Sequence, residues 1–470
     1  MTQINYQTKD KSQLPEGGIV KCRAIYNDKI LVDYRGNPLN EALPPDLYKS
    51  GMTDALEYLP AYNANDRKMS PEDRYAMVRR LLRLFIVLPQ HRRLAEKLQG
   101  VIRGGYVGRN PTIPGYYRYT RKRVIKMLRN MGMPVDSAIA QFGLEDDEST
   151  VIRTIDELLG AAHGFQFIGL SGMGKSTTLR KILSRYPQVL LHDMYKGVPC
   201  SFQQVVWLHL ECPSDGRLTG LCERFFKALD ELLDSNYSSG AVIGGRQKQQ
   251  HLLVLMMGLL AQLHGIGVLV IDEIQRLSEA RSGGHFQMLN FFSELTTTIG
   301  VPVVLVGTPK AQTMLTSEFR QTRRGCGEGE TIWSRLNEDE AWHEFLQSLW
   351  HYQYTREESP LGLQWDEKDS EGHAVPVVPS ELSHVMYDET QGIVDLAVKL
   401  YMLAQTRAIR SGKEMVNKDI IRSVAYDSFG SARVALDALR RNDTTAIDQL
   451  GDLNLDIEPL MDLEISRKAA

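Results

Sequence analysis

Short hydrophobic runs recur through the middle of the chain, and helix-like segments separate them. The runs are residues 165–170, 189–192, 205–210, 267–272 and 301–308. Short runs rich in Val, Ile, Leu and Phe are typical of buried strands. Helices are predicted at residues 177–185, at about residues 216–233, and from Lys248 onward after a glycine-rich link at residues 238–245. Strands that alternate with helices predict an α/β core, a doubly wound parallel sheet flanked by helices.

The segments on either side of this core have other patterns. Little periodicity is present in the first forty-odd residues, whereas residues 70–100 become helical after a good start signal at Ser70 and Pro71. After Trp333 the pattern is helical, with an aromatic-rich stretch at residues 341–354 and an amphipathic one at residues 392–411. We divide the chain into an N-terminal helical and irregular extension (1–135), the α/β core (136–335), a C-terminal helical lid (336–435) and an acidic tail (436–470). The tail fits either a solvated segment or one that folds on docking to a partner.

The strand predicted at residues 165–170 leads into a phosphate-binding loop. Residues 169–176 read G-L-S-G-M-G-K-S and fit the pattern G-x-x-x-x-G-K-[ST] at every fixed position. In this motif backbone N–H groups and the positive end of the following helix converge on phosphates. We expect Lys175 to reach the β- and γ-phosphates of ATP and Ser176 to hold Mg²⁺. The expected nucleotide-binding residues are Gly169, Ser171, Gly172, Met173, Gly174, Lys175, Ser176 and Thr177.

Two further strand ends carry polar groups that ATP hydrolysis requires. The run at residues 267–272 ends in Asp272 and Glu273, as expected at the carboxyl edge of a parallel sheet. Asp272 is expected to bind Mg²⁺ through its water shell, and Glu273 to polarise the attacking water. Thr308 ends the next strand, where its side chain is placed to sense the γ-phosphate. Together these residues predict a Mg²⁺-dependent ATPase.

An arginine cluster follows Thr308 after a helix-like stretch at residues 309–319. It consists of Arg320, Arg323 and Arg324. Ring-forming ATPases complete each site with an arginine from the neighbouring subunit, and one member of this cluster is expected to act as such a finger. A solvated basic loop is the alternative interpretation for each arginine.

Length and composition exclude several classes of protein. The chain has 470 residues, enough for two or more domains, and its 43% apolar content is ordinary for a globular protein. Its apolar runs are shorter than the roughly eighteen residues of a membrane span, and its first residues lack the apolar core of a signal peptide. The five cysteines form no Cys-x-x-Cys pair, which indicates reduced thiols in a cytosol.

Any contact with nucleic acid has to come from a local patch, because the net charge is only −3. Residues 101–135 contain no acidic residue and interleave basic side chains with tyrosines. The basic residues are Arg103, Arg109, Arg118, Arg121, Lys122, Arg123, Lys126 and Arg129. This composition suits contacts with phosphates and packing against bases or sugars. A solvated basic helix or a subunit contact is equally compatible with it.

The order of these parts resembles the AAA+ class of ATPases, and several segments resemble the TnsC-type transposition regulators, which are related to MuB and TniB. The segments are residues 102–111 (I-R-G-G-Y-V-G-R-N-P), 272–277 (D-E-I-Q-R-L), 281–284 (R-S-G-G), 288–292 (M-L-N-F-F) and 300–311 (G-V-P-V-V-L-V-G-T-P-K-A). The resemblance covers roughly residues 25–435. It implies a cytoplasmic, nucleoid-associated bacterial protein that forms a ring or helical filament on double-stranded DNA with ATP. Such a protein links a TnsD/TniQ-type target selector to a TnsA/TnsB-type transposase, with hydrolysis controlling assembly.

One departure from the AAA+ pattern lies in the lid. Many AAA+ lids carry an arginine at the start of the third lid helix, after a Gly-x-x pattern. Here residues 392–395 read G-I-V-D, and Lys399 follows one turn later. The pattern therefore does not identify a lid residue that acts on the nucleotide.

The likeness to AAA+ proteins that encircle DNA favours a DNA contact in the core. Arg217 and Arg281 are the leading candidates, with Arg246 and Lys248 behind them. Arg217 begins a helix after the strand at residues 205–210, and Arg281 lies beside two glycines in the loop after the Asp-Glu strand. Phosphate contacts from these residues would not discriminate sequence, and the basic segment at residues 103–129 competes for the same role. The alternative function is a signalling or replication-loader ATPase that acts on protein partners without binding DNA.

Overall fold

The computed structural model divides the chain into two compact units. The first comprises residues 1–48, 93–168 and 178–332, and the second residues 49–92, 169–177 and 333–470. Within them the structure describes residues 20–46, 49–130, 132, 162–239, 250–279, 285–312, 330–361, 367–368, 374–375, 381–443, 446–447 and 455–466.

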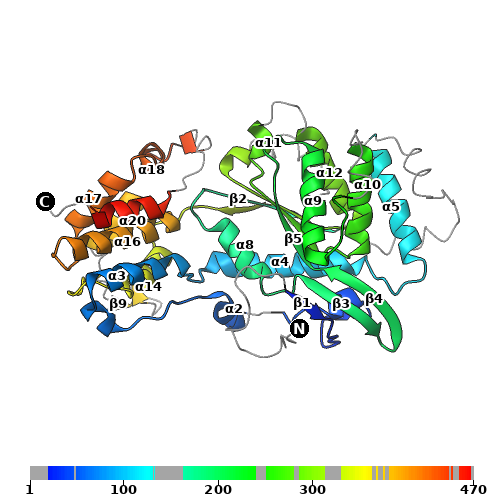
Figure 1. The fold of residues 1–470 in the computed structure, drawn as a ribbon, viewed down its shortest axis with the longest axis horizontal. Coiled ribbons are helices and arrows are strands. Elements are labelled where there is room, and N and C mark those ends of the chain that lie inside the picture. Colours follow the sequence, from blue (N-terminus) through cyan, green and yellow to red (C-terminus); the bar gives the residue numbers. More distant parts are fainter. Residues whose placement is uncertain are drawn as a thin grey trace. The chain divides into compact units, whose positions relative to one another are not determined.

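The first unit is built on a five-stranded sheet in the order β5-β6-β7-β2-β8 (Figure 1). Its strands are β2 (Phe165–Gly169), β5 (Trp207–Glu211), β6 (Val268–Asp272), β7 (Val303–Gly307) and β8 (Glu330–Trp333). Strands β5, β6, β7 and β2 run parallel, and their register pairs Leu208 with Leu269 and Phe167 with Val306. All residues of β6 and β7 are buried, as in a parallel sheet covered on both faces. The predicted α/β core is therefore confirmed.

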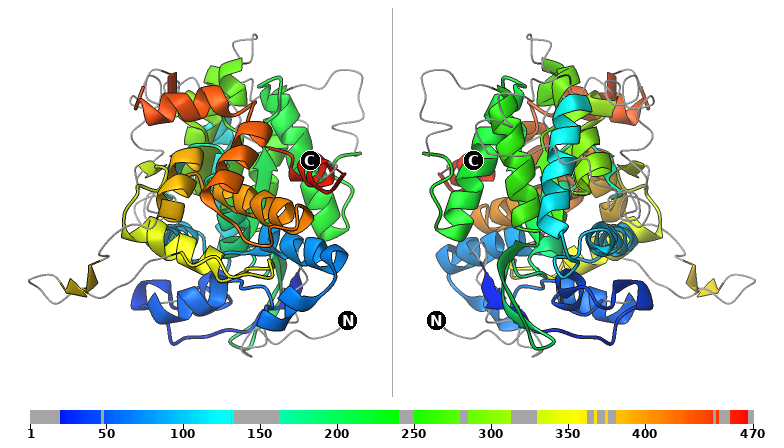
Figure 2. Two further views of the ribbon diagram at one scale, coloured as in Figure 1. Left: turned by 90° about the vertical axis from the view of Figure 1, so that its left-hand side faces the viewer. Right: turned by 90° about the vertical axis from the view of Figure 1, so that its right-hand side faces the viewer.

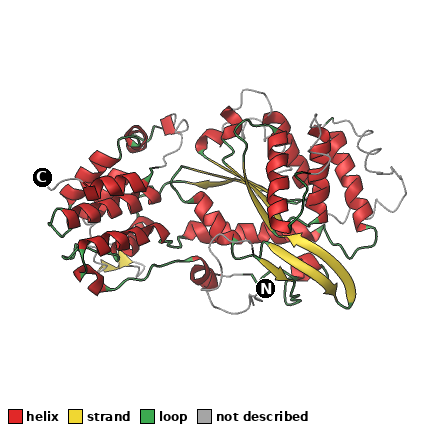
Figure 3. Cartoon of the chain, in the orientation of Figure 1, coloured by secondary structure: helices red, strands yellow, loops and turns green. Residues whose placement is uncertain are grey.

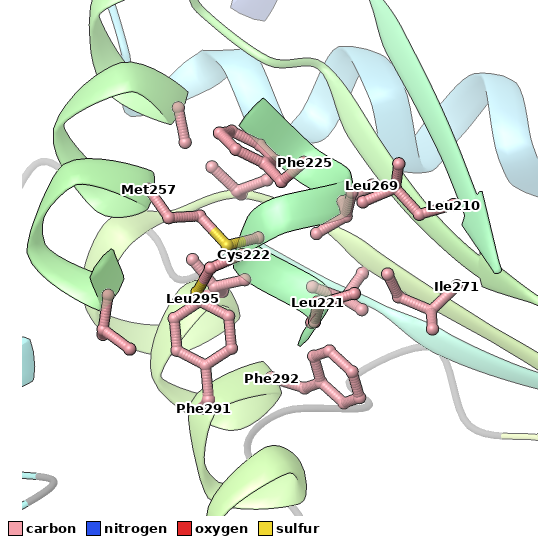
Figure 4. Packing of buried hydrophobic residues seen from close by; sticks show 14 of the residues in the cluster. Leu210, Leu221, Cys222, Phe225, Met257, Leu269, Ile271, Phe291, Phe292 and Leu295 are labelled. Atoms are coloured by element: carbon pink, nitrogen blue, oxygen red, sulfur yellow. The ribbon is translucent and has the colours of Figure 1, made fainter. Parts of the chain in front are cut away.

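The helices of the first unit pack through apolar faces. They are α1 (Pro38–Glu41), α4 (Pro89–Val107), α5 (Tyr116–Asn130), α8 (Lys175–Leu183), α9 (Leu218–Leu233), α10 (Gln250–Leu263), α11 (Arg276–Glu279) and α12 (His285–Glu294), with a 3-10 turn η2 (Val32–Tyr34) and a π-helical turn η5 (Leu295–Ile299). In α9 the buried residues recur every three or four positions. Figure 4 shows Leu221, Cys222 and Phe225 of α9 packed among side chains of β5, β6, α10 and α12. This cluster holds α9 on the sheet, with α10 and then α5 beside it (Figures 1 and 2).

Residues 189–192 belong to a second sheet, so the prediction that they lie in the parallel sheet is wrong. The second sheet has the order β1-β3-β4, with strands Lys21–Arg23, Val189–Tyr195 and Val198–Val205. β3 and β4 form an antiparallel hairpin closed by Lys196 and Gly197, whose φ angles of 49° and 82° are those of a type I′ turn. Because the hairpin ends at Val205, the predicted strand at residues 205–210 divides between β4 and β5.

The structure also corrects the interpretation of three basic residues as DNA contacts. Arg103 and Arg109 are each 1% exposed, and Arg123 is 8% exposed. The Arg103 guanidinium pairs with Asp46 and also donates to two backbone oxygens. Guanidinium groups used in this way are not available to phosphates. The exposed basic side chains described in α5 are Lys126 and Arg129.

The segment around Arg109 fastens α4 to the sheet. Arg109 Nη1 donates to the backbone oxygen of Ile266 (2.6 Å), and the Tyr106 hydroxyl donates to that of Gly265 (2.8 Å). Both acceptors lie just before β6. A Cβ at Gly105 would lie 2.4 Å from Pro302 Cγ, so this close approach requires glycine. Residues 102–111, one of the segments that resemble TnsC-type regulators, thus have a structural role at the amino ends of β6 and β7.

The second unit is almost entirely helical (Figure 3). Its elements are α2 (Lys49–Leu56), α3 (Pro71–Val78), α14 (Glu340–Trp350), α15 (Glu381–Thr390), α16 (Val394–Arg410), α17 (Lys418–Ser428), α18 (Arg433–Arg440), α20 (Ile457–Ser466), the 3-10 turns η3 (Ala64–Lys68) and η4 (Arg79–Arg83), and the hairpin strands β9 (Glu367–Lys368) and β10 (Ala374–Val375). Ser70 caps α3 by accepting a hydrogen bond from Asp73 N, as its sequence signal predicts. The helical region predicted after the sheet is confirmed.

The described part of the acidic C-terminal segment packs within this unit. Helix α20 lies along α16, and its Glu464, only 1% exposed, pairs with Arg407. Arg407 also donates to Asp427 Oδ2 (2.9 Å), and Met461 of α20 is fully buried. Residues 455–466 are therefore an ordered part of the helical unit and not a solvated tail.

Candidate nucleotide-binding site

The phosphate loop begins at the carboxyl end of β2 and ends where α8 starts. Gly172 and Gly174 have φ angles of +79° and +78°, a left-handed conformation that glycine adopts at little cost. The ammonium of Lys175 folds over the loop and donates to the backbone oxygens of Gly169 (2.8 Å) and Leu170 (2.9 Å). Ser176 and Thr177 lie in the first turn of α8, where helix N–H groups have no partner within the helix. The loop thus turns from β2 into α8 through two glycines in the left-handed conformation.

Helix α16 provides a close neighbour for this loop, whose residues 169–177 belong to the same second unit. The backbone N–H of Asp395, in the first turn of α16, donates to the Gly172 oxygen (3.1 Å). A Cβ at Gly172 would lie 2.9 Å from Ile393 Cγ2, and one at Gly169 would lie 2.8 Å from the Trp333 backbone oxygen. Side chains at either position would displace the loop from these partners, so both positions favour glycine.

The acidic pair lies at the carboxyl end of β6, as its sequence position predicts. Asp272 is 5% exposed, and its Oδ1 accepts the backbone N–H of Glu273 (2.9 Å). Glu273 itself has φ +59°, which is unfavourable for a residue with a Cβ. Its carboxylate accepts a hydrogen bond at Oε2 from Gln275 Nε2 (2.6 Å). Both carboxylates are therefore held in defined orientations by neighbouring groups.

Thr308 lies at the end of the adjacent strand, β7. It is 6% exposed, and its backbone N–H donates to Gln275 Oε1 (3.3 Å). Its hydroxyl is buried, and no group among the described residues forms a hydrogen bond with it. Buried hydroxyl groups are normally paired, so this one is suited to a ligand oxygen such as that of a phosphate. A nucleotide with Mg²⁺ fits the chemistry of this donor and of the two carboxylates beside it.

The predicted arginine finger and most predicted DNA contacts lie outside the described residues. This applies to Arg320, Arg323, Arg324, Arg281, Arg246 and Lys248. Arg217 lies within the described residues and is the N-cap of α9. Its side chain is 66% exposed, and its Nε lies 3.9 Å from Asp215 Oδ2. Its position at the start of this helix agrees with the sequence prediction, and its guanidinium is accessible to a partner.

The lid residues that replace the usual arginine form an internal pair. Lys399 is 6% exposed, and its ammonium donates to Asp395 Oδ2 (2.7 Å) and to the Leu455 backbone oxygen (2.7 Å). Burial raises the pKa of Asp395, and the hydrogen bond from Lys399 opposes that rise. The lysine thus joins the start of α16 to the segment before α20.

Two polar side chains beside the acidic pair received no role from the sequence. His209, on β5, places Nε2 3.3 Å from Asp272 Oδ2 because β5 pairs in parallel with β6. Gln275 contacts both Glu273 and Thr308, as described above. The only sequence signal for His209 was a polar residue within an apolar strand. Gln275 lies in the D-E-I-Q segment, and its spacing of two from Glu273 was the available clue.

Comparison with known proteins agrees with this geometry. The family described as AAA domain matches residues 165–315, from β2 to just beyond β7. This part of the chain is an AAA domain. No curated protein matches the chain. Within the described residues, no helix has the length and apolar character needed to cross a membrane.

Several solved structures are similar to this chain over part of its length. A Walker-type ATPase of Pyrococcus abyssi is 14% identical, with 60% of this chain and 72% of that chain covered at a TM-score of 0.35. The ORC2 protein of Aeropyrum pernix, in ADPNP and ADP complexes, is 14% identical, with coverages of 61% and 71% and a TM-score of 0.34. The ORC1 protein of Aeropyrum pernix, in complex with DNA, is 13% identical, with coverages of 77% and 85% and a TM-score of 0.35.

Proposed function

We propose that the chain is a Mg²⁺-dependent ATPase. The observation that carries this proposal is the placement of Asp272, Glu273 and Thr308 at the carboxyl ends of two adjacent parallel strands, β6 and β7. β7 also pairs in parallel with β2, which leads into the phosphate loop. Polar groups at the carboxyl ends of neighbouring parallel strands converge on one edge of a sheet, where α/β proteins bind their ligands.

Each of these residues then has one task. Backbone N–H groups of the loop and the Lys175 ammonium would bind the phosphates, and Ser176 and Asp272 would hold the metal. Bound Mg²⁺ would neutralise the charge of the phosphates. The Glu273 carboxylate would orient the attacking water and accept its proton, while the Thr308 hydroxyl would donate to a γ-phosphate oxygen.

At a finer level, we infer a regulator of DNA transposition of the TnsC type. The support is the resemblance of residues 25–435 to that family, and not the geometry of the site. Such a regulator assembles with ATP as a ring or helical filament on double-stranded DNA of any sequence. It would bridge a TnsD/TniQ-type target selector and the TnsA/TnsB transposase, and ATP hydrolysis would control how long the assembly lasts.

Imaging the protein with random-sequence duplex DNA tests both levels when combined with a hydrolysis assay. We expect Mg²⁺-dependent release of phosphate, and oligomers on DNA with ATP but not without nucleotide. Hydrolysis without any DNA assembly would favour the alternative, a signalling or loader ATPase whose partners are proteins. The absence of hydrolysis under both conditions would contradict the ATPase itself.

Glu273→Gln separates binding from turnover. The amide keeps the size of the side chain but cannot accept the proton of the attacking water. We expect ATP binding close to wild type, loss of hydrolysis, and DNA-bound oligomers that persist after free ATP is removed. Turnover at the wild-type rate would show that another acid positions the water.

A further inference from the structure

Gln275 lies between the ends of β6 and β7 and bonds to both of them. Its Nε2 donates to Glu273 Oε2 (2.6 Å), and its Oε1 accepts the backbone N–H of Thr308 (3.3 Å). An ionised carboxylate only accepts and a backbone N–H only donates, so a single orientation of the amide satisfies both neighbours. The side chain therefore bridges the expected general base and the strand end that carries the expected phosphate sensor.

The backbone around this bridge leaves the amide little freedom. A Cβ at Gly307 would lie 3.1 Å from Gln275 Oε1 and 2.5 Å from Ile274 Cγ2, so glycine at this position makes room for both. Ile274 is fully buried, and its N–H donates to the Val306 backbone oxygen (3.0 Å). These contacts anchor the turn that carries Gln275 to the end of β7.

Glu273 depends on this support because its own backbone is strained. Its φ of +59° is unusual for a residue with a side chain, and such conformations persist only where neighbouring groups hold them. The N–H of Glu273 donates to Asp272 Oδ1 (2.9 Å), and the side chain is held by Gln275. The bond to Gln275 occupies Oε2 and directs the orientation of the other carboxylate oxygen.

We propose that Gln275 is a positioning residue that fixes the Glu273 carboxylate for hydrolysis and couples it to Thr308. This proposal rests on the ATPase function proposed above. The buried Thr308 hydroxyl has no hydrogen-bonding partner among the described residues, so a phosphate oxygen bound there would shift the strand end toward it. Because the Thr308 N–H is tied to Gln275, the same shift would move the carboxylate of Glu273. Occupancy of the γ-phosphate position would thereby align the base.

Gln275→Met in the full-length protein tests the positioning role. Methionine has nearly the same length and shape but neither donates to Glu273 nor accepts from Thr308. We expect kcat to fall roughly 10–100-fold, the effect of losing one hydrogen bond to a charged group, while the Kd of a fluorescent ATP analogue stays within about twofold. Gln287→Met is the matched control, since Gln287 is exposed and bonds only to Gln250 in the described structure. It should leave kcat unchanged.

A further measurement separates positioning from a general structural effect. In nucleotide-free wild-type protein, the side-chain amide resonance of Gln275, assigned by its loss in Gln275→Met, should shift in Glu273→Gln.

The outcomes distinguish this inference from the proposed function. A wild-type protein without ATPase activity contradicts the proposed function, while the amide resonance still tests the contact. An active wild type with an unchanged or faster Gln275→Met overturns the positioning role, as does a Gln275 resonance that does not respond to Glu273→Gln.

Discussion

Arg74 is a buried arginine whose positive charge is balanced by one carboxylate, that of Glu414. Its side chain is 0% exposed, and its Nη1 and Nη2 donate to the two oxygens of Glu414 at 2.6 and 2.8 Å. Nη1 also donates to the Tyr354 backbone oxygen (3.1 Å), whereas Nε has no hydrogen-bonding partner among the described residues. Glu414 has φ +54°, so the substitution that tests this pair should preserve the backbone and remove only the charge. Glu414→Gln does this.

The structure sets the size of the expected effect. In the variant, one amide oxygen can accept from one guanidinium nitrogen, and the amide NH₂ faces the other nitrogen, donor against donor. The guanidinium is then buried with no opposite charge in direct contact. Breaking buried ion pairs in this way costs about 3–5 kcal/mol. With a urea slope of about 2 kcal/mol/M, the unfolding midpoint of the second unit should fall by about 1.5–2.5 M.

Tryptophan fluorescence during urea unfolding is a suitable assay. Trp342 and Trp350 are both buried in the second unit, so their emission reports on the unit that contains the pair. Glu358→Gln is the matched control, because Glu358 pairs with Arg67 but its side chain is 72% exposed, and exposed pairs contribute about 0–1 kcal/mol. A Glu414→Gln midpoint equal to that of Glu358→Gln would show that the buried Arg74 does not require the Glu414 charge.

The same pair predicts a dependence on pH. Burial alone would raise the pKa of Glu414, but the hydrogen bonds from Arg74 and from the Arg356 backbone outweigh it, and the pKa lies below its ordinary value of 4.5. A carboxylate with a lowered pKa stabilises the fold at pH values above 4.5, and this stabilisation is lost as the pH falls through the folded-state pKa. The stability difference between wild type and Glu414→Gln should therefore be constant near neutral pH and shrink in acid. A difference that grows in acid would contradict the sign.

Three further predictions concern the nucleotide and DNA. Lys175→Ala should abolish ATP binding in an equilibrium assay, because the phosphates lose their point-charge partner; retained affinity would show that the loop is not the site. Arginine fingers contribute roughly 10³–10⁵ in rate. If Arg320, Arg323 or Arg324 is the finger, mixing the variant of that arginine with Lys175→Ala should restore hydrolysis in trans. Mixed oligomers that are not rescued by a variant of any of the three would exclude this cluster as the source of the finger. Arg217→Ala/Arg281→Ala should weaken binding to all duplexes alike and reduce the salt slope by about one unit per lost contact, whereas undiminished assembly would move the contact to the N-terminal segment.

The site residues that can be recognised from the sequence are those that lie within short motifs of fixed spacing. The phosphate loop, the Asp-Glu strand end and Thr308 were each recognised from short segments, because the motif residues act through backbone positions fixed within a few residues. The alternation of apolar runs and helices likewise predicted the α/β core. The hairpin of β3 and β4 was missed because its turn, Lys196-Gly197, lacks the Asn-Gly or Asp-Gly signal of most type I′ turns.

Packing between distant segments determines which charged side chains are available to ligands. Arg103 and Arg109 look like DNA contacts in the sequence, yet their partners Asp46 and Ile266 lie far away in the chain and bury them. Arg74 and Glu414 are separated by 340 residues and form one bidentate pair. The role inferred for Gln275 likewise depends on a strand end 33 residues away. The charge of a side chain follows from its residue type, but its burial and its partners are set by packing between distant segments. The spacing of residues along the chain does not show which distant segments pack together.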